Sequence, residues 1–312
     1  MQKSSALSVL PWSRIFFFIF AILCFTPYFS SPLALLGGVL IANIWGHPFP
    51  GLKSKWVSNM LKISIVGLGL GMNFNEALAT TQSGFWLIAG SILFTLVAGL
   101  SLARWIGLDR TQGFLISVGT AICGGSAIAA VSPVVKATDQ QMSISLGVVF
   151  LLNAIALLIF PSIGWYLGIS QIEFGTWSAI AIHDTSSVVG AANTYGLEAL
   201  NIATTLKLSR ALWIIPVSLI SMFLFRAKGQ KIKIPFFIFA FIGATLLSTY
   251  FPFSFSEQLV GLSRSILVLT LLFIGLNLSK EKIKSAGLKP LLLGGLLWVL
   301  VSVGSLLVIL LG

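Results

Sequence analysis

Residues 179–196 read Ala-Ile-Ala-Ile-His-Asp-Thr-Ser-Ser-Val-Val-Gly-Ala-Ala-Asn-Thr-Tyr-Gly, the densest group of hydrogen-bonding side chains in the sequence. This stretch places five polar side chains in a row, in a chain that is otherwise strongly apolar: His183, Asp184, Thr185, Ser186 and Ser187. A charged side chain at the centre of a bilayer costs roughly 3 kcal/mol on insertion scales. A polar block that is kept between apolar segments at this cost is therefore expected to have a functional role.

The composition indicates a polytopic, all-α membrane protein. Of the 312 residues, 57% are hydrophobic and 9% are charged, and the mean hydropathy is +1.01. Soluble domains carry about 25% charged residues. The net charge of +11 would suggest a nucleic-acid partner in a soluble protein, but here basic cytoplasmic loops explain it, so no nucleic-acid partner is expected. We expect residues 1–312 to form one integral membrane domain.

Long runs of apolar residues, separated by turn-forming residues, predict about eleven transmembrane helices. Their approximate ranges are 15–25, 33–45, 56–74, 84–103, 112–131, 142–165, 176–195, 201–225, 234–251, 258–278 and 290–311.

The basic residues predict a cytoplasmic N-terminus and an outer C-terminus, since Lys and Arg in short loops mark the cytoplasmic side. With eleven spans, fourteen basic residues fall inside: Lys3, Arg14, Lys53, Lys55, Arg104, Arg110, Arg226, Lys228, Lys231, Lys233, Lys280, Lys282, Lys284 and Lys289. Only Lys136 falls in an outer loop. This asymmetry fits a multi-pass protein of a bacterial inner membrane.

A short internal similarity is compatible with two inverted halves, which many transporters share. The sequence Gly-Met-Asn-Phe-Asn at 71–75 resembles Gly-Leu-Asn-Leu-Ser at 275–279. The two copies would run in opposite directions across the membrane, as inversion requires.

The first place that carries chemistry is the small-residue stretch at 119–130. Cys123, Gly124, Gly125 and Ser126 lie at its centre, and Pro133 follows. Glycines in a membrane helix permit either close packing or local unwinding that exposes backbone groups to a ligand. We expect unwinding at 124–126 and helix packing at 127–130.

The second place is the polar block itself. His183 and Asp184 could shuttle a proton or bind a coupling cation, while Thr185, Ser186 and Ser187 offer hydroxyls to a substrate or ion. The alternative is a structural hydrogen-bonded cluster in which a nearby Lys or Arg neutralises the aspartate.

The third place is a pair of basic residues on one helical face, Lys207 and Arg210. Arg210 lies about ten residues from the nearer predicted end of its span, too deep to reach the interface easily. It is expected to face the protein interior, either paired with Asp184 or binding an anion. Lys62 and Arg264 lie nearer to span ends, and snorkelling is expected for both.

Three motifs in order identify a resemblance that covers essentially the whole chain. They are Ala-Ile-Cys-Gly-Gly-Ser-Ala-Ile-Ala-Ala at 121–130 with Pro-Val-Val-Lys-Ala at 133–137, His-Asp-Thr-Ser-Ser-Val-Val-Gly-Ala at 183–191, and Lys-Leu-Ser-Arg-Ala-Leu-Trp-Ile-Ile-Pro at 207–216. The chain resembles the YeiH family of bacterial inner-membrane proteins, described as sulfate exporters and related to the bile-acid and arsenite transporter superfamily. The resemblance implies a panel domain and a core domain, with two broken helices that cross in the core.

The resemblance and the charges together predict a secondary transporter for a small anion such as sulfate, a sulfonate or a carboxylate. The resemblance implies that 123–126, 183–187, Lys207 and Arg210 lie near the transport pathway. Within the predicted spans four basic residues face one clear acid, Asp184, and broken-helix N-termini in the segments at 112–131 and 258–278 could add amide donors. Transport by alternating access, coupled to H⁺ or Na⁺ at Asp184 and His183, is the expected mechanism.

Two other classes of function stay open at this point. A channel would need rings of like residues around a pore, which one chain does not reveal. An intramembrane serine protease could use Ser126 with His183, but adjacent His183 and Asp184 point to different faces of a helix, so the triad geometry is poor. We therefore expect no enzymatic activity.

Metals and cofactors are not indicated. Cys24 and Cys123 form no CxxC pair, and His47 and His183 are far apart in the sequence. The expected partners are the anion, the coupling ion and the lipid bilayer, with a homodimer possible.

Overall fold

The computed structural model describes residues 11–26, 28–49, 54–225, 236–252, 254–278 and 287–311, and every regular element within these ranges is an α-helix. In chain order the helices are α1 (Pro11–Leu23), α2 (Ser31–Ile44), α3 (Ser54–Gly69), α4 (Phe74–Ile106), α5 (Arg110–Ala121), α6 (Gly125–Val131), α7 (Asp139–Leu167), α8 (Gln171–Ala181), α9 (Thr185–Tyr195), α10 (Leu197–Leu212), α11 (Ile214–Leu224), α12 (Phe237–Tyr250), α13 (Ser256–Leu276) and α15 (Leu288–Leu311). The all-α prediction is confirmed.

Five of these stretches are long and apolar enough to cross a membrane: α4, α7, α10 with α11, α13 and α15. The helices α1, α2 and α12 are apolar but shorter. Large apolar side chains lie on the outer surface of the bundle, among them Trp86, Phe94, Phe223 and Leu307. A surface of this kind is stable against lipid and unfavourable in water.

Two of the predicted transmembrane spans do not cross the bundle, because each is a hairpin of two shorter helices. The segment predicted at 112–131 is a hairpin of α5 and the short α6, and the Gln141 side chain at the start of α7 donates to the Asp109 carboxylate before α5 at 2.7 Å. A helix that crossed the bundle would leave residues 109 and 141 at opposite ends. The hairpin therefore returns to the end at which it began.

The segment predicted at 176–195 is a second hairpin, made of α8 and α9. The Tyr195 hydroxyl at the end of α9 donates to the Ile169 carbonyl before α8 at 2.5 Å. The Gln171 side chain at the start of α8 accepts from the Glu198 amide at the start of α10 at 3.1 Å. Both ends of this hairpin therefore lie together.

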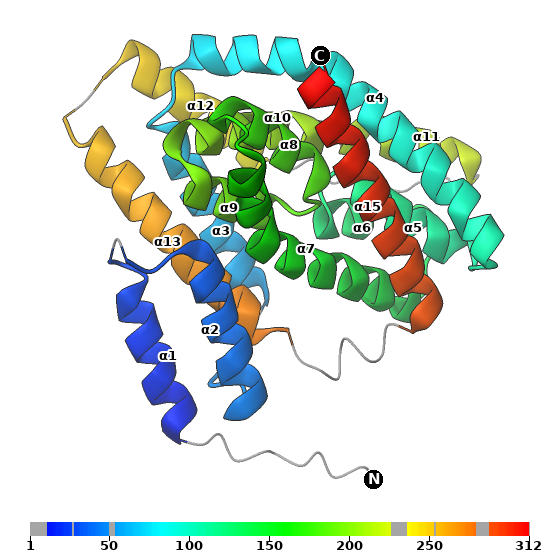
Figure 1. Ribbon diagram of the computed structural model, residues 1–312, viewed down its shortest axis with the longest axis horizontal. Coiled ribbons are helices and arrows are strands. Elements are labelled where there is room, and N and C mark those ends of the chain that lie inside the picture. Colours follow the sequence, from blue (N-terminus) through cyan, green and yellow to red (C-terminus); the bar gives the residue numbers. More distant parts are fainter. Residues whose placement is uncertain are drawn as a thin grey trace.

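These hairpins correct the prediction of eleven crossings, because two of the eleven segments return instead of crossing. The long helix α7 joins the hairpins, so they enter from opposite ends of the bundle (Figure 1). Since two crossings are removed, the predicted sides of the N- and C-termini are unchanged. Only the part of the chain between the hairpins changes side.

That change moves Lys136, the one basic residue assigned to an outer loop. Lys136 follows α6 and is exposed, and it lies at the same end as Asp109 and Arg110. Every basic residue in the loops between the predicted spans is then assigned to the cytoplasmic side. Of these, Lys3, Lys53, Arg226, Lys228, Lys231, Lys233, Lys280, Lys282 and Lys284 lie outside the described residues.

Cysteine labelling tests this topology. In a background without Cys24 and Cys123, the substitution Lys136→Cys is expected to react with an impermeant maleimide only from the cytoplasmic side. Arg104→Cys is the inner control and Asn75→Cys the outer one, and both native residues are exposed. Labelling of Lys136→Cys in intact cells, as for Asn75→Cys, would restore the eleven-span arrangement.

The helices pack in two groups. The first consists of α1, α2, α3, α12 and α13, in which α13 packs along both α2 and α3. Gly38 of α2 and Gly275 of α13 bring two backbones into contact, because a Cβ added at Gly38 would lie 2.8 Å from the Leu276 nitrogen. The segment predicted at 258–278 is one continuous helix from Ser256 to Leu276, so the expectation of a break there is wrong.

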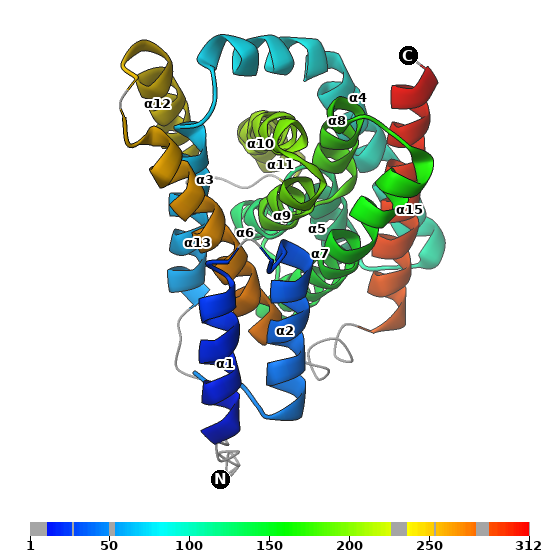
Figure 2. The ribbon, with the colours of Figure 1, turned by 60° about the vertical axis from the view of Figure 1, so that its left-hand side comes forward.

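The second group surrounds the hairpins and contains α5 to α10 and α15. The helix α8 packs on α10 and α15, and α7 packs on α5 and α9. The 33-residue α4 packs on α5, α10 and α15 and also contacts α12 of the first group. Figure 2 shows α4 along the upper edge of the molecule, from the side of α12 towards α15.

Candidate functional site

The tip of the first hairpin is a short loop of three buried residues. The helix α5 ends at Ala121, and Ile122, Cys123 and Gly124 separate it from α6. Gly124 has φ +65° and ψ −124°, a backbone conformation that favours glycine. The expected unwinding at 124–126 therefore lies slightly earlier in the chain, because α6 already begins at Gly125.

The tip of the second hairpin lies at the start of the polar block. The helix α8 ends at Ala181, and Ile182 and Asp184 are extended. Asp184 is the N-cap of α9: its carboxylate accepts from the Ser186 amide at 3.1 Å and also from the Ser186 hydroxyl. A carboxylate suits this position because a helix N-terminus carries partial positive charge.

The two tips meet inside the bundle. A Cβ added at Gly124 would lie 3.3 Å from the Asp184 Cβ, which brings the first break against the second. The stretches at 123–126 and 183–187, some 60 residues apart in the sequence, thus meet at Gly124 and Asp184.

Asn153 of α7 holds the second tip and was missed in the sequence. Its Oδ1 accepts from the His183 amide at 3.0 Å and from the Asp184 amide at 3.1 Å. Asn153 is 3% exposed, and its Nδ2 has no partner among the described residues. A lone amide side chain in the middle of the long apolar stretch 142–165 was the available signal.

Lys207 and Arg210 are completely buried, and both bind the C-terminal ends of the half-helices. The Lys207 ammonium donates to the carbonyls of Ala179 at 3.2 Å and Ile182 at 2.7 Å. The Arg210 guanidinium donates to Ala121 at 2.7 Å, at the end of α5, and to Ile180 at 2.6 Å, at the end of α8. The two cations thus satisfy carbonyls that a helix break leaves without partners, and they oppose the negative ends of two helix dipoles.

The sequence left open whether Arg210 pairs with Asp184. The hydrogen bonds of Arg210 go to backbone carbonyls of the two hairpins, with none to Asp184 among the described contacts. The interior position predicted for Arg210 is confirmed, since its side chain is 0% exposed, and Lys207 is buried to the same extent. Arg264, expected to snorkel, is partly buried on α13, and its Nε is buried with no partner in the described part of the chain.

Several buried polar atoms around the tips have no hydrogen-bond partner among the described residues. They include both ring nitrogens of His183, Nη2 of Arg210, Nδ2 of Asn153 and Oγ1 of Thr120. Buried polar groups are normally hydrogen-bonded, and exceptions suggest a water or ligand. Asp184 is only partly buried, and Ser126 on α6 is exposed, so the tip region is open to one side.

Outside the hairpin tips, the N-cap of α8 lowers the pKa of the Glu173 carboxylate. The Ser170 side chain and the Ser170 amide, the latter at 2.6 Å, hydrogen-bond the Glu173 carboxylate and hold its pKa below the usual range. This capping box fixes the start of α8 and therefore the depth to which the hairpin reaches.

Comparison with known proteins finds relatives over nearly the full length. The model of the family described as "Conserved hypothetical protein 698" matches residues 8–294. A UPF0324 membrane protein of Photobacterium profundum is 50% identical over 297 residues, covering 95% of this chain and 91% of the relative. A UPF0324 membrane protein of Bacteroides thetaiotaomicron is 46% identical over 303 residues, with 94% and 92% covered. The chain therefore belongs to this family of UPF0324 membrane proteins, the one that its motifs resemble under the name YeiH.

Proposed function

We propose that this protein is a secondary transporter that moves a small anion across the bacterial inner membrane by alternating access. The observation that carries the proposal is the charge at the hairpin tips. Lys207 and Arg210 supply two positive charges and Asp184 one negative charge, all on the residues that form or contact the tips. One formal positive charge thus has no counter-charge in this cluster, and a small oxyanion such as sulfate or a sulfonate would supply it.

The start of α9 offers the donors that an oxyanion needs. The residues Thr185, Ser186 and Ser187 form its first turn, where backbone amides point out of the helix. The Ser186 amide already bonds Asp184, which leaves the hydroxyls of Thr185 and Ser187 and the exposed Ser126 as the proposed contacts. Cys123, Gly124 and Gly125 would border the anion through their backbone.

The two helix groups suggest how access could alternate. The group with α1, α2, α3, α12 and α13 corresponds to the proposed panel, and the group around the hairpins to the proposed core. Two hairpins entering from opposite ends fit an inverted repeat, and α4 contacts both groups. Movement of the core along the panel would expose the tips to each side in turn.

Asp184 and His183 are the proposed coupling residues. Asp184 caps α9 with one oxygen and is partly accessible, while both ring nitrogens of His183 lack a hydrogen-bond partner in the described part of the chain and would bind the proton. Proton or Na⁺ binding at Asp184 would change the charge of the tip, and so its affinity for the anion.

The alternatives fit the site less well. A channel would conduct without saturation, which a transport assay distinguishes. A serine protease would need Ser126 hydrogen-bonded to His183, and the described contacts contain no such bond.

The test is exchange of labelled sulfate, sulfite, sulfonates and dicarboxylates in proteoliposomes, at two pH values and with or without Na⁺. We expect saturable uptake of one anion class, lost in Asp184→Asn and reduced at least about tenfold in Ser187→Ala. The control is Asp139→Asn, which changes an exposed carboxylate at the start of α7. If no anion is taken up while a cation or neutral solute is, the anion proposal is wrong; uptake that does not saturate supports the channel.

A further inference from the structure

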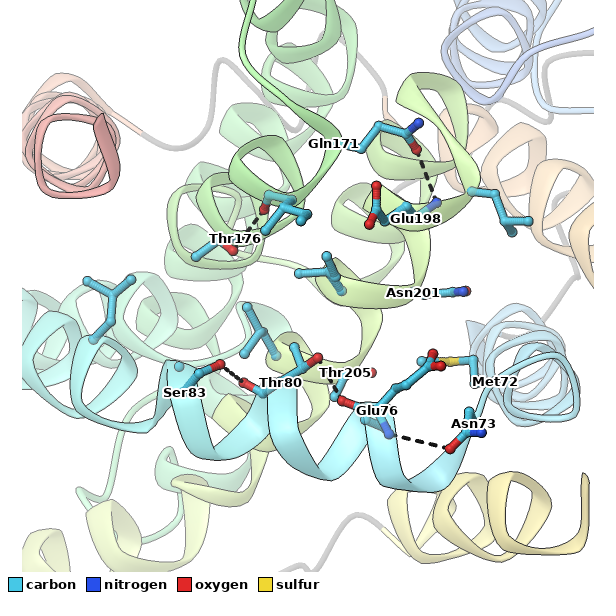
Figure 3. A pocket seen from close by; sticks show the side chains of 17 residues that line it. Met72, Asn73, Glu76, Thr80, Ser83, Gln171, Thr176, Glu198, Asn201 and Thr205 are labelled. Atoms are coloured by element: carbon cyan, nitrogen blue, oxygen red, sulfur yellow. Dashed lines mark hydrogen bonds between the residues drawn. The ribbon is translucent and has the colours of Figure 1, made fainter. Parts of the chain in front are cut away.

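A cavity of about 750 Å³ with many polar lining residues lies where α4, α8 and α10 begin (Figure 3). It is open on one side and is lined by the first half of α4, the start of α8 and the first two to three turns of α10. Gln171, at the start of α8, lines it and accepts from the Glu198 and Ala199 amides, which fixes α8 against α10. The cavity is distinct from the hairpin tips, since none of the residues 122–126 and 182–187 lines it.

The charge in this cavity is negative. Glu76 of α4 and Glu198 of α10 line it, each in the first turn of its helix, and its described lining contains no Lys, Arg or His. A cleft lined by one sign of charge concentrates ions of the opposite sign. The ligand that suits this cavity is therefore a cation, in contrast to the anion proposed for the tips.

A polar stripe continues from the carboxylate into the membrane part of α10. Glu198, Asn201 and Thr205 are separated by three and four residues, so they share one helical face, and all three line the cavity. Thr205 is 6% exposed, and its Oγ1 has no hydrogen-bond partner among the described residues.

Thr120 and Thr204 share the lack of a partner among the described residues, but neither lines the cavity, and other buried threonines bond within their helix. Thr245 donates to the Phe241 carbonyl at 2.9 Å, and Thr270 donates to the Ile266 carbonyl at 2.7 Å, the usual arrangement for a hydroxyl inside an apolar helix. The Thr205 hydroxyl lacks such a bond and lies beside a polar cavity, so it is available to a ligand. An unpartnered buried hydroxyl is otherwise costly.

The size of the cavity and its apolar walls favour an organic cation over a bare ion. Organic ligands occupy pockets of roughly 300–1,000 Å³ that combine apolar walls with a few polar groups. Leu87, Ile172 and Ile202 supply apolar wall, and Glu76 and Glu198 supply two acceptors for ammonium groups.

We propose that this cavity is a binding site for a small protonated amine. The carboxylates of Glu76 and Glu198 bind ammonium groups, and Asn201 and Thr205 supply further acceptor oxygens at its deeper end. The site is independent of the proposed anion transport, because it uses other residues and a ligand of opposite charge.

The experiment is calorimetric titration of the purified full-length protein with putrescine and with tetramethylammonium, alongside Na⁺, Ca²⁺ and sulfate. We expect putrescine to bind, and Glu198→Gln and Glu76→Gln each to raise its Kd about tenfold or more. Thr205→Val, which keeps the shape of the side chain, is expected to raise the Kd several-fold. Glu257→Gln, at an exposed carboxylate in the first turn of α13 that does not line the cavity, is the matched control and should leave the Kd unchanged.

Two outcomes would overturn the proposal. One is amine binding that persists in both carboxylate variants, provided they elute as folded protein; the other is binding of Ca²⁺ or Na⁺ without binding of putrescine. The variant Asp184→Asn separates this site from the hairpin tips: it should abolish anion transport and leave putrescine binding intact. Loss of putrescine binding in Asp184→Asn alone would place the amine at the tips and refute the cavity site.

Discussion

Replacing Arg210 with methionine is expected to destabilise the folded protein by about 3 kcal/mol or more and to abolish the proposed transport. The guanidinium is completely buried and donates to carbonyls at the ends of α5 and α8. Without it, two buried carbonyls lose their partners, and each unsatisfied group costs about 1–3 kcal/mol. Thermal and denaturant unfolding in detergent, followed by tryptophan fluorescence, measures the loss.

Arg210→Lys should be intermediate, because an ammonium keeps the charge but cannot reach both half-helices with a planar fork of donors. The matched control is Arg104→Met, at an exposed arginine in the last turn of α4, where the change should stay within about 0.5 kcal/mol. Equal stability of Arg210→Met and Arg104→Met would show that the half-helix ends do not depend on the guanidinium.

The position of Arg210 could be predicted from the sequence, but its hydrogen-bond partners could not. Its distance from both ends of an apolar segment was sufficient to predict an interior position, and the structure places it there. Its partners could not be predicted, because they are backbone carbonyls that become free only where α5 and α8 break. Every residue has such a carbonyl, so no side-chain pattern marks those that a cation will bind.

The hairpins were missed for a related reason. Hydropathy depends on composition and length, so two consecutive apolar half-helices of 7 to 12 residues resemble one span of about twenty. Direction reverses at Gly124 and at Asp184, and the sequence marks these positions as polar or glycine-rich without indicating a reversal. Lys136 was the one sign of a reversal in the sequence, since it was the one basic loop residue assigned to the outer side.

The location of the second hairpin tip could be predicted from the polar residues in an apolar segment. His183 to Ser187 stood out because polar side chains are costly in an apolar segment, and the structure brings one of them, Asp184, against Gly124 at the first tip. Whether these residues bind an anion and a coupling ion stays a prediction. Asn153 obeys the same rule, but a single amide in the long α7 is a weaker signal than five polar residues in a row.

Asn153→Leu is therefore expected to have the second large effect, a destabilisation of about 3 kcal/mol with loss of transport. The Asn153 Oδ1 is the acceptor for the His183 and Asp184 amides at the break between α8 and α9. Leucine has a similar volume and no acceptor, so two amides in the interior would be left without partners, at about 1–3 kcal/mol each.

Asn153→Asp is the informative comparison, since aspartate keeps an acceptor oxygen in the same place. If the acceptor alone matters, this variant should unfold close to the wild type and retain the hairpin. Its added negative charge would cancel the single uncompensated positive charge of Lys207, Arg210 and Asp184, so anion transport should still fall sharply. Wild-type stability together with undiminished transport in Asn153→Asp would indicate that the tip charge does not select the substrate, because the fold would be intact while the proposed electrostatic basis of selection had been removed.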